Sequence, residues 1–326
     1  MNIFYNPVYF KTKKVFLTKQ FKHSIFFNLL IDFNYFTNMP IPEKFILSGP
    51  QKRMNNLVKA FKHDPEVKFN SLKHNNTYIV QFDDFGKKVV EKIINSNNEN
   101  KKIIIGPLYN VENGKELNKL TNKHSFIKKL VSSDITYSNQ LAKDPNFKKE
   151  NTLICPSGVI SKKEVYSNLK LKNRNNKCLI YFKKRTVEEL DKLINFLKSK
   201  NLDFEIFEYN KYTNDRLILA AKEFSFGITL SSTESQGFAI QEIMSCNLPL
   251  LVWDKTINKY GGLSLPGTTV TLWDQRCGLV VKNFEELTSH FDNFYNNLDT
   301  FQPAELVLEK LTFEIFNRKL KDCFNF

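Results

Sequence analysis

The chain has 326 residues, of which 41% are hydrophobic and 13% aromatic, so it is long enough for two domains with complete cores and is not a disordered polymer. Its formal net charge of +14 permits nucleic acid or an anionic membrane as a partner but requires neither, because the 48 Lys and Arg residues are scattered along the chain. The five cysteines contain no CxxC pair and the five histidines no paired spacing, which argues against a zinc site and a disulfide framework.

The N-terminal residues 1–38 combine lysines with many Phe and Tyr residues. This pattern fits a basic, aromatic surface helix in peripheral contact with a membrane, or an extra strand and helix packed on the domain that follows. We favour the second interpretation and treat 1–38 as an N-terminal extension. The most apolar run here, 24–33, is too short to cross a membrane and no cleavage site follows it, so the sequence predicts a cytoplasmic protein.

A first series of strands and helices follows the extension. The segments 44–50, 77–82 and 101–110 are short apolar runs that predict strands, and the residues between them have helical spacing. Residues 124–139 predict a helix, a short strand and a turn. Strands that alternate with helices of about 10 to 15 residues indicate a parallel sheet. We therefore predict a Rossmann-like α/β domain over residues 39–165, on the acceptor side of the molecule.

A second series follows a polar break at residues 167–177. Apolar strands are predicted at 178–182, 203–209, 226–232 and 248–253. Helical segments separate them, and a long amphipathic segment at 303–323 closes the chain. We predict a second Rossmann-like domain over 166–326, on the donor side, with the last helix packed back on the first domain. The fold class is thus α/β, with two Rossmann-like domains that face each other across a cleft.

The segment STESQGFAIQEIMSC (232–246) leads from a predicted strand into a predicted helix. Ligands of open α/β sheets bind beyond the carboxyl ends of the strands, and the first N–H groups of the following helix suit a phosphate. Gly237 has no Cβ, so a phosphate can approach the backbone there. Glu234 in the loop and Glu242 in the helix can accept hydrogen bonds from sugar hydroxyls. The same residues also fit an ordinary strand–helix turn, since a Glu near a helix N-terminus is favourable without any ligand.

Five residues carry a resemblance to a known family: Glu234, Gly237, Phe238, Glu242 and Pro249. Two glutamates separated by seven residues, with a glycine and an aromatic residue between them and a proline before the next strand, resemble the C-terminal domain of the retaining glycosyltransferases of family 4. The resemblance covers roughly residues 178–255, and over 44–160 it rests on the α/β pattern alone. It implies the GT-B fold and a nucleotide-diphospho-sugar held between the two domains.

The resemblance also implies a role for each residue of this stretch. Glu234 would contact the donor sugar at the reacting centre, and Glu242 would bind the ribose. The donor diphosphate would be held by a short run around the glycine: Ser235, Gln236, Gly237 and Phe238.

The family places a basic pair after the first strand of the second domain. Here Lys183, Lys184 and Arg185 are consecutive at the end of the strand predicted at 178–182, where they would stabilise the departing diphosphate. The family spaces its Arg and Lys further apart, and the later position is a Glu in this chain, so the individual assignments stay open. A lysine-rich turn without a function is the alternative.

Other candidates lie outside this motif. Gly49 belongs to a Ser-Gly-Pro-Gln segment that either faces the diphosphate or is a plain turn. Tyr209 and Tyr212, at and after the end of the strand predicted at 203–209, either stack on the nucleotide base or are exposed tyrosines. Asp84 and His124 are candidates for touching the donor sugar, with Asp84 as general base if the reaction inverts. Three residues of the loop at 269–283 would shape the donor pocket or cap a glycine: Trp273, Asp274 and Arg276.

These residues predict a glycosyltransferase that moves a sugar from a nucleotide-diphosphate donor to a glycan, protein or lipid acceptor, with retention of configuration. No cofactor is expected, and no metal, because no DxD-type cluster is present and the cations at 183–185 can replace it. One alternative is a nucleotide-sugar epimerase or phosphorylase of the same fold. Another is a non-catalytic basic protein that binds glycan or nucleic acid. A DNA-modifying glycosyltransferase would combine sugar transfer with nucleic-acid binding.

Overall fold

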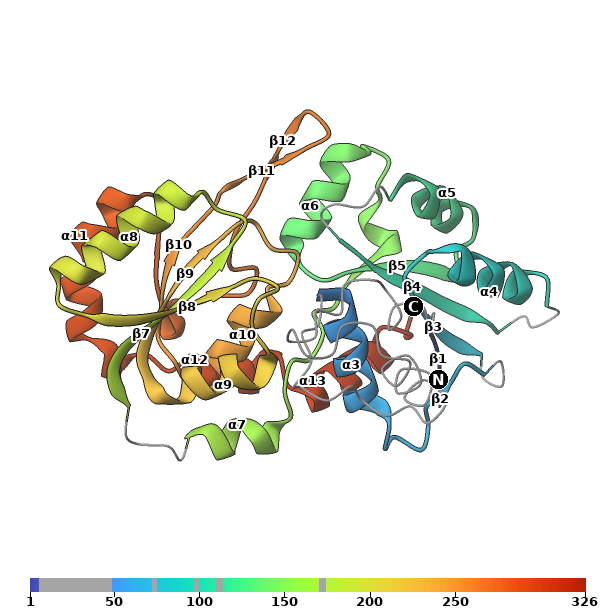
Figure 1. Ribbon diagram of the computed structural model, residues 1–326. Coiled ribbons are helices and arrows are strands. Elements are labelled where there is room, and N and C mark those ends of the chain that lie inside the picture. Colours follow the sequence, from blue (N-terminus) through green and yellow to red (C-terminus); the bar gives the residue numbers. More distant parts are fainter. Residues whose placement is uncertain (6–48, 72–74, 97–99, 110–113, 170–173) are drawn as a thin grey trace, which may run out of the picture.

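The structure, a computed structural model, describes residues 1–5, 49–71, 75–96, 100–109, 114–169 and 174–326. Two sheets, each covered by helices, form the centres of two domains that lie side by side (Figure 1). Most of the strand predicted at 44–50 lies outside the described residues, as does the hypothesis of membrane contact through residues 6–38. A helix that crosses a bilayer needs about 20 apolar residues, and the described part of the chain contains no helix of that kind.

The first sheet has six strands in the order β2-β1-β3-β4-β5-β6, and all neighbours are parallel. Its strands are β1 (Asn2–Phe4), β2 (Lys68–Phe69), β3 (Asn76–Val80), β4 (Lys102–Leu108), β5 (Ile127–Val131) and β6 (Thr152–Ile154). β1 is buried, and Ile3 pairs with Tyr78 of β3 and with Phe69 of β2. Residues 2–4 of the predicted extension therefore belong to the sheet of the first domain, as a short strand buried between two others.

Helices cover both faces of this sheet. They are α3 (Gly49–Phe61), α4 (Asp84–Ile94), α5 (Lys115–Lys123) and α6 (Asp134–Lys143). Val90 of α4 and Leu117 of α5 share one core cluster, whereas Met54 of α3 belongs to the cluster on the other face. The order predicted for 124–139 was wrong, since the strand β5 comes first and α6 follows it. Periodicity alone does not distinguish so short an apolar run from a helix, and pairing with β4 and β6 decides it.

The second sheet has five parallel strands in the order β13-β10-β9-β7-β8. They are β7 (Asn175–Lys183), β8 (Asp203–Glu208), β9 (Phe224–Ser231), β10 (Leu250–Trp253) and β13 (Gly278–Val281). The central strands are continuous apolar runs because both faces of the sheet are covered. An antiparallel hairpin of β11 (Ile257–Tyr260) and β12 (Leu263–Pro266) leaves this domain and contacts α6 of the first (Figure 1).

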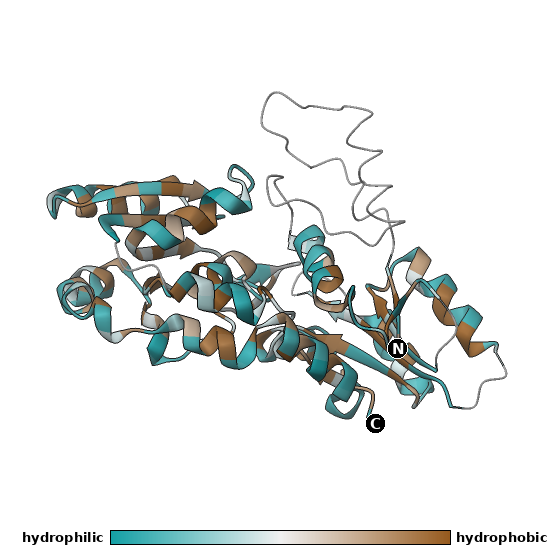
Figure 2. Cartoon of the chain, turned by 90° about the horizontal axis from the view of Figure 1, so that it is seen from below, coloured by the Kyte–Doolittle hydropathy of each residue, from teal (hydrophilic) through white to brown (hydrophobic). Residues whose placement is uncertain are grey.

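Five long or medium helices enclose the second sheet. They are α8 (Val187–Ser199), α9 (Asn214–Glu223), α10 (Phe238–Ser245), α11 (Phe284–Asn296) and α12 (Pro303–Lys310). α8 and α11 contribute Leu193 and Phe291 to one core cluster, and α9, α10 and α12 contribute to the other. Hydrophilic and hydrophobic residues alternate along the helices (Figure 2), as expected for elements with one buried side. Asn247 has φ 57° just after α10, the left-handed conformation in which many helices end.

The two domains are joined by a linker and by the end of the chain. After β6 the chain reaches α7 (Lys162–Leu169) and then β7. The amphipathic segment predicted at 303–323 is divided, because Thr312 caps a new helix, α13 (Phe313–Asp322), by accepting a hydrogen bond from the Ile315 N–H. α13 packs against α3 of the first domain, where Phe316 meets Phe61 with ring centroids 5.6 Å apart. The two domains are therefore held together by a helix as well as by the linker.

Both sheets reverse their strand order at one point. The order reverses between β1 and β3 in the first sheet, and between β7 and β9 in the second. Such a switch point opens a crevice at the carboxyl ends of the two strands, where ligands of doubly wound sheets bind. In the second sheet those ends are Lys183 and Ser231, which are paired in register.

Candidate functional site

A cavity of about 620 Å³ lies between the two domains at these strand ends. Its first-domain wall consists of Gly49, Pro50, Lys52, Gln81 and Tyr109. On the second-domain wall the cavity contains nine residues proposed from the sequence: Lys183, Lys184, Tyr209, Tyr212, Glu234, Ser235, Gln236, Gly237 and Phe238. The same wall contains others that were not proposed, among them Tyr181, Asn210, Asn214, Ser232, Thr233, Asn258 and Lys259.

Glu234 and Lys183 form an ion pair on the second-domain wall. The Lys183 Nζ atom donates to both carboxylate oxygens of Glu234 at 2.7 Å, and the Ser231 hydroxyl donates to Oε1 at 2.9 Å. The side chains of Lys183 and Glu234 are only 15% and 9% exposed. A buried carboxylate is stable when a cation and hydrogen bonds replace its water, so this geometry keeps a negative and a positive charge side by side at the cavity.

The turn after β7 separates the three basic residues. Lys184 has φ 51°. Its exposed side chain and that of Lys183 line the cavity, whereas Arg185 has other partners. Arg185 donates to both carboxylate oxygens of Glu189 at 2.7 and 2.8 Å and to the carbonyl oxygens of Ser231 and Trp253. It is not among the residues that line the cavity.

The structure thus places Arg185 away from the cavity, and its proposed catalytic role stays a prediction. Its guanidinium lies 4.9 Å from the centre of the Trp253 ring, and its hydrogen bond is the main cause that lowers the pKa of the Glu189 carboxyl. Thr186 and Glu189 form a capping box at the start of α8. Arg185 thus belongs to the beginning of this helix. Of the three basic residues in this turn, Lys183 and Lys184 line the cavity.

Gly237 begins α10 at the cavity. It has φ 82° and ψ 50°, a left-handed conformation that disfavours a side chain by about 1–2 kcal/mol. The carbonyl of Gly237 accepts the first helical hydrogen bond, from Gln241 at 3.0 Å. The N–H groups of the first helical turn have no partner within the helix, and here that turn, with Phe238 and Ala239, lines the cavity.

The loop before α10 is fastened to the first domain. The carbonyl oxygen of Ser235 accepts hydrogen bonds from three hydroxyl groups of the first domain, those of Ser132, Ser133 and Thr136, at 2.7, 2.9 and 3.3 Å. The side chain of Gln236 accepts from the Ser157 N–H at 3.0 Å and donates to the Ser157 carbonyl at 2.7 Å. These contacts hold the loop that carries Glu234 in one conformation relative to both domains.

Glu242 lies deeper than expected. It is 3% exposed and does not line the main cavity; it lines a second cavity of about 480 Å³ instead. Its carboxylate accepts a short hydrogen bond from Lys52 of α3, which also donates to Asn214. Glu242 therefore meets Lys52, a lysine of the other domain that lines the main cavity, and its contact with a ribose stays a prediction.

The first-domain wall was largely missed by sequence reasoning. Gly49 lines the cavity at the start of α3, as does Lys52 one turn later. Gln81 follows β3 with φ 69° and Tyr109 follows β4, so both occupy carboxyl ends of strands. A polar or aromatic residue directly after an apolar strand was the available signal for these two. Nothing local to the sequence indicates that Lys52 meets Glu242, 190 positions away.

Three tyrosines, one from β7 and two from the segment after β8, line the cavity. Tyr209 lies under Lys183, whose Nζ atom is 4.6 Å from the ring centre. Tyr181 and Tyr212 pack edge to face with centroids 6.2 Å apart. Burial raises the pKa of both hydroxyls, and the charge of Glu242 adds to the effect on Tyr212. These two tyrosines stay protonated and offer an apolar surface with a neutral hydroxyl, while Tyr209 offers a ring that is only partly buried.

Two first-domain candidates lie away from the cavity. Asp84 is exposed in the first turn of α4, directly after the cap residue Asp83. His124 ends α5, and its ring is 5.4 Å from that of Phe126. Neither lines the cavity, so the structure does not bring them together with the other candidates, and their contact with a donor sugar stays a prediction. Asp84 is placed by helix capping, because an acid in the first turn favours the helix by itself.

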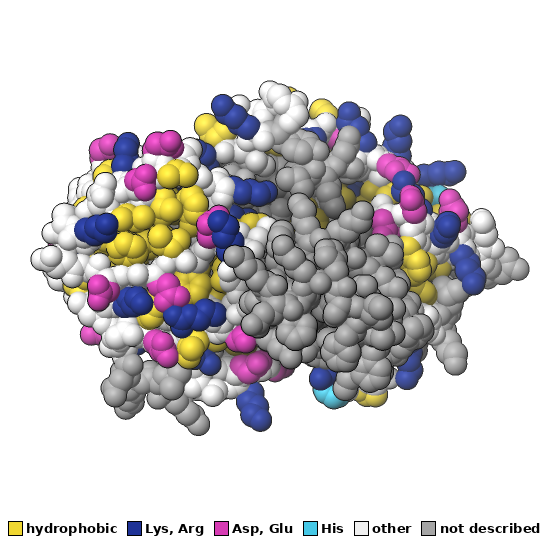
Figure 3. All heavy atoms as spheres, viewed as in Figure 1, with side chains coloured by type: hydrophobic (Ala, Val, Ile, Leu, Met, Phe, Trp, Pro, Cys, Tyr) yellow, Lys and Arg dark blue, Asp and Glu magenta, His cyan; other side chains and the backbone are white. Residues whose placement is uncertain are grey.

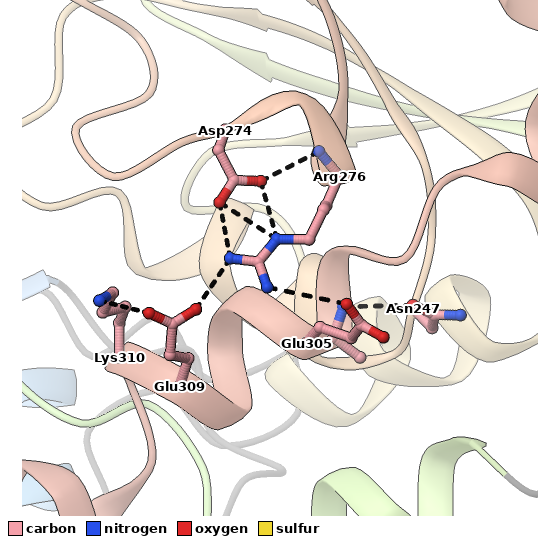
Figure 4. Close-up of polar contacts among 7 residues, drawn as sticks. Asn247, Asp274, Arg276, Glu305, Glu309 and Lys310 are labelled. Atoms are coloured by element: carbon pink, nitrogen blue, oxygen red, sulfur yellow. Dashed lines mark hydrogen bonds and ion pairs between the residues drawn. The ribbon is translucent and has the colours of Figure 1, made fainter.

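The loop residues Asp274 and Arg276 also lie outside the cavity. Figure 4 shows the Arg276 guanidinium between Asp274 and two carboxylates of α12, those of Glu305 and Glu309, at 2.7, 3.7 and 2.9 Å. Hydrogen bonding to Arg276 lowers the pKa of the Asp274 carboxyl. Asn247 accepts from the Ala304 N–H nearby. This cluster ties the end of α10 and the loop to α12, which is a structural role.

The cavity thus combines cations, the start of a helix, a carboxylate and partly buried tyrosines. Lys183, Lys184 and the first turn of α10 suit an anion, and Glu234 suits hydroxyl groups. No cluster of three or more His, Cys, Asp or Glu side chains that could hold a metal ion occurs within the described ranges.

No protein-family model matches the chain, and no curated protein matches its sequence. Solved structures match its fold. The GtfA/B complex is similar with a TM-score of 0.52 and 12% identity over 87% of this chain and 61% of that chain. A variant of S. aureus TarM in complex with fondaparinux, alpha-GlcNAc-glycerol and UDP is similar with a TM-score of 0.49 and 16% identity, over 87% and 60%. The pneumococcal O-GlcNAc transferase GtfA in complex with UDP and GlcNAc follows with 0.45 and 15%, over 76% and 56%.

These similarities show the fold alone. The assignment of the fold rests on the GtfA/B complex, whose TM-score is above 0.5. The protein has the GT-B fold, with two Rossmann-like domains that face each other across a cleft. The chain spans about 60% of the length of the first of these structures.

Proposed function

We propose that this protein is a glycosyltransferase that uses a nucleotide-diphospho-sugar as donor and retains the configuration of the transferred sugar. The observation that carries the proposal is the buried Lys183–Glu234 pair beside Gly237, at the switch point of the second sheet and on the wall of the interdomain cavity. Resemblance to glycosyltransferases of family 4 over residues 178–255 supports the same assignment.

The diphosphate of the donor would bind between the β7 turn and α10. Lys183 and the exposed Lys184 supply positive charge there. Among the described residues no carboxylate pairs with Lys184, so its charge is available to a ligand. The N–H groups of Gly237 and Phe238 at the start of α10 suit phosphate oxygens, and the helix dipole adds to the attraction. The nucleoside would extend towards Tyr209 and Asn214.

The donor sugar would lie against Glu234. Each carboxylate oxygen accepts more than one hydrogen bond, so sugar hydroxyls can bind while Lys183 stays in contact. In the reaction the bond between the anomeric carbon and the diphosphate oxygen breaks, and a bond from that carbon to the acceptor oxygen forms. The acceptor proton passes to the departing diphosphate, on the same face. Lys183 stabilises the charge that develops on the leaving group, and no separate general base is needed.

The residues of the cavity indicate the chemical class of the donor, a nucleotide-diphospho-sugar, and do not select a particular acceptor. UDP-linked sugars are tested together with the other common nucleotide sugars. A glycan, protein or lipid acceptor remains open. An epimerase or phosphorylase of the same fold would use the same cavity, but it would turn over a nucleotide sugar without an acceptor, or with phosphate.

A nucleic-acid binder is the less favoured alternative. On the face drawn in Figure 3, the Lys and Arg side chains of the described residues are interspersed with Asp and Glu. Binding that depends on phosphate contacts falls steeply with salt, whereas binding of a nucleotide sugar in a cavity does so much less.

The test is a thermal-shift screen with nucleoside diphosphates and nucleotide sugars, followed by turnover assays of the donor that binds. A ligand at 100 times its dissociation constant adds about 2.7 kcal/mol to the free energy of unfolding, so we expect a clear increase in Tm with at least one donor. Glu234→Gln should lose turnover by about 100-fold or more, whereas Glu223→Gln, at an exposed acid of α9, should not. Absence of any shift across the common donors would refute the proposal.

A further inference from the structure

Lys52 is a buried lysine that connects the two domains. It lies in the first turns of α3, is 9% exposed, and lines the main cavity. Its Nζ atom donates to Oε2 of Glu242 in α10 and to Oδ1 of Asn214 at the start of α9. The cation comes from the first domain, and both acceptors come from the second. Asn214 lines both the main cavity and the second cavity, on which Glu242 lies.

A carboxylate as buried as that of Glu242 needs a charged partner to stay ionised and fixed. The side chains of Lys52 and Glu242 are 11% and 5% exposed, so water screens their attraction weakly. Glu234 receives its cation from its own domain, through Lys183. Glu242 receives one from α3, and this contact exists only while the two domains are together.

We propose that Lys52 is a positioning residue for nucleoside recognition. It joins the Glu242 carboxylate, behind the cavity wall, to Asn214 on that wall, so that closing the two domains and binding the nucleoside of the donor become one coupled event. Two of its three N–H donors are directed at Glu242 and Asn214, so we assign its effect to these two side chains. This inference rests on the proposed function and goes beyond it, because it assigns to the first domain a part in selecting the nucleoside.

Two probes separate this role from direct phosphate binding. UDP contains a nucleoside and a diphosphate, whereas inorganic diphosphate lacks the nucleoside. With Lys52→Met we expect the Kd of UDP to rise about tenfold or more, the cost of leaving one buried polar partner unpaired. The Kd of inorganic diphosphate should change less than about twofold. Both values are measured by calorimetry, with another nucleoside diphosphate in place of UDP if the donor screen selects it.

Matched variants complete the experiment. Lys52→Arg keeps the charge and should restore most of the UDP affinity, and Lys62→Met, which removes an exposed lysine just beyond α3, should leave it unchanged. Glu242→Gln should give the same nucleoside-selective loss, and combining it with Lys52→Met should add little, because the two residues act as one unit. Equal losses for UDP and inorganic diphosphate, or no loss for either, would overturn the inference.

A measurement without ligand keeps this test separate from the proposed function. Small-angle X-ray scattering should show a larger radius of gyration for Lys52→Met and for Glu242→Gln than for the wild type and Lys62→Met. If no nucleoside diphosphate binds the wild type, the proposed function fails, and the scattering alone decides the link between domains. An unchanged radius in both variants means that Lys52 does not hold the domains together, and the inference falls.

Discussion

The two walls of the interdomain cavity are built differently. The second-domain wall comes mainly from neighbouring strand ends and one loop: Lys183 ends β7, Ser231 ends β9, and Glu234 follows three residues later. Their ion pair and hydrogen bonds lie within one domain. The first-domain wall comes from separate elements, at the start of α3 and after β3 and β4. Its buried cation, Lys52, binds a carboxylate of the opposite domain.

This difference separates residues that we expect to serve the reaction from residues that hold the two domains together. The contacts of the pair on the second-domain wall all come from the second domain, so the charge for a donor does not need a side chain of the first domain. The pair formed by Lys52 and Glu242 depends on the relative position of the domains, as do the hydrogen bonds from Ser132 and Ser133 to the loop at Ser235. We therefore expect changes on the second wall to affect the reaction itself, and changes at contacts between the walls to affect binding and stability.

The largest effect is expected at Lys183. Replacing Lys183 with Met removes the cation that faces the leaving group and leaves Glu234 buried without it, so the rate of sugar transfer should fall about 100-fold or more. The free energy of unfolding should fall by about 3 kcal/mol. Steady-state kinetics with the donor selected by the screen and urea denaturation measure the two effects.

Arg185→Met is the matched comparison, because Arg185 is two positions away but faces Glu189 and Trp253. It should lower stability through the start of α8, while the rate per folded molecule stays within about tenfold of the wild type. If Arg185→Met abolishes turnover in folded protein and Lys183→Met does not, the assignment of the two residues is reversed.

The next effect concerns the contact between the walls. Gln236→Ala removes the partner of both the N–H and the carbonyl of Ser157, and each buried polar group left unpaired costs about 1–3 kcal/mol. We expect the free energy of unfolding to fall by about 3 kcal/mol in urea denaturation. The exposed Gln275 offers a control, and Gln275→Ala should be neutral. A neutral Gln236→Ala would show that the domains do not depend on this bridge.

A smaller effect is expected at a third buried lysine. Lys52 and Lys183 pair with carboxylates, whereas this lysine donates to neutral side chains. Lys129 of β5 is 0% exposed and donates to Asn118 at 2.7 Å and Thr121 at 3.3 Å. Burial lowers its pKa to about 8. Between pH 8 and 10.5 the unfolded chain holds this proton and the folded chain does not, so the stability of the wild type should rise with pH. Below pH 8 both states hold the proton, and the cost of burying the charge is constant.

The measurement compares the wild type with Lys129→Met, which has no such titration. The difference in free energy of unfolding should shift by about 2 kcal/mol in favour of the wild type as the pH rises through this range. Lys123→Met, at an exposed lysine of α5, should give a flat difference. A flat difference for Lys129→Met as well would contradict the lowered pKa.

Much of the second domain could be read from the sequence because its signals are local. The apolar strands around 178–182 and 226–232, and the loop with Glu234 and Gly237, lie in one continuous stretch and fix their own geometry. The turn at Lys184 shows where this reading stops. Three consecutive cations look equivalent in the sequence. In the structure Lys184 has a left-handed conformation, and Arg185 binds Glu189 and does not line the cavity.

The sequence by itself determined two α/β domains, the ends of the central strands, and the acid–glycine–acid stretch at the start of α10, because hydrophobic period and turn chemistry act over a few residues. Only the tertiary structure decided that β1 opens the first sheet, that α13 returns to α3, and that Lys52 meets Glu242. Such contacts join positions far apart in the chain, and their energy comes from burial and charge pairing that exist only after the domains have come together.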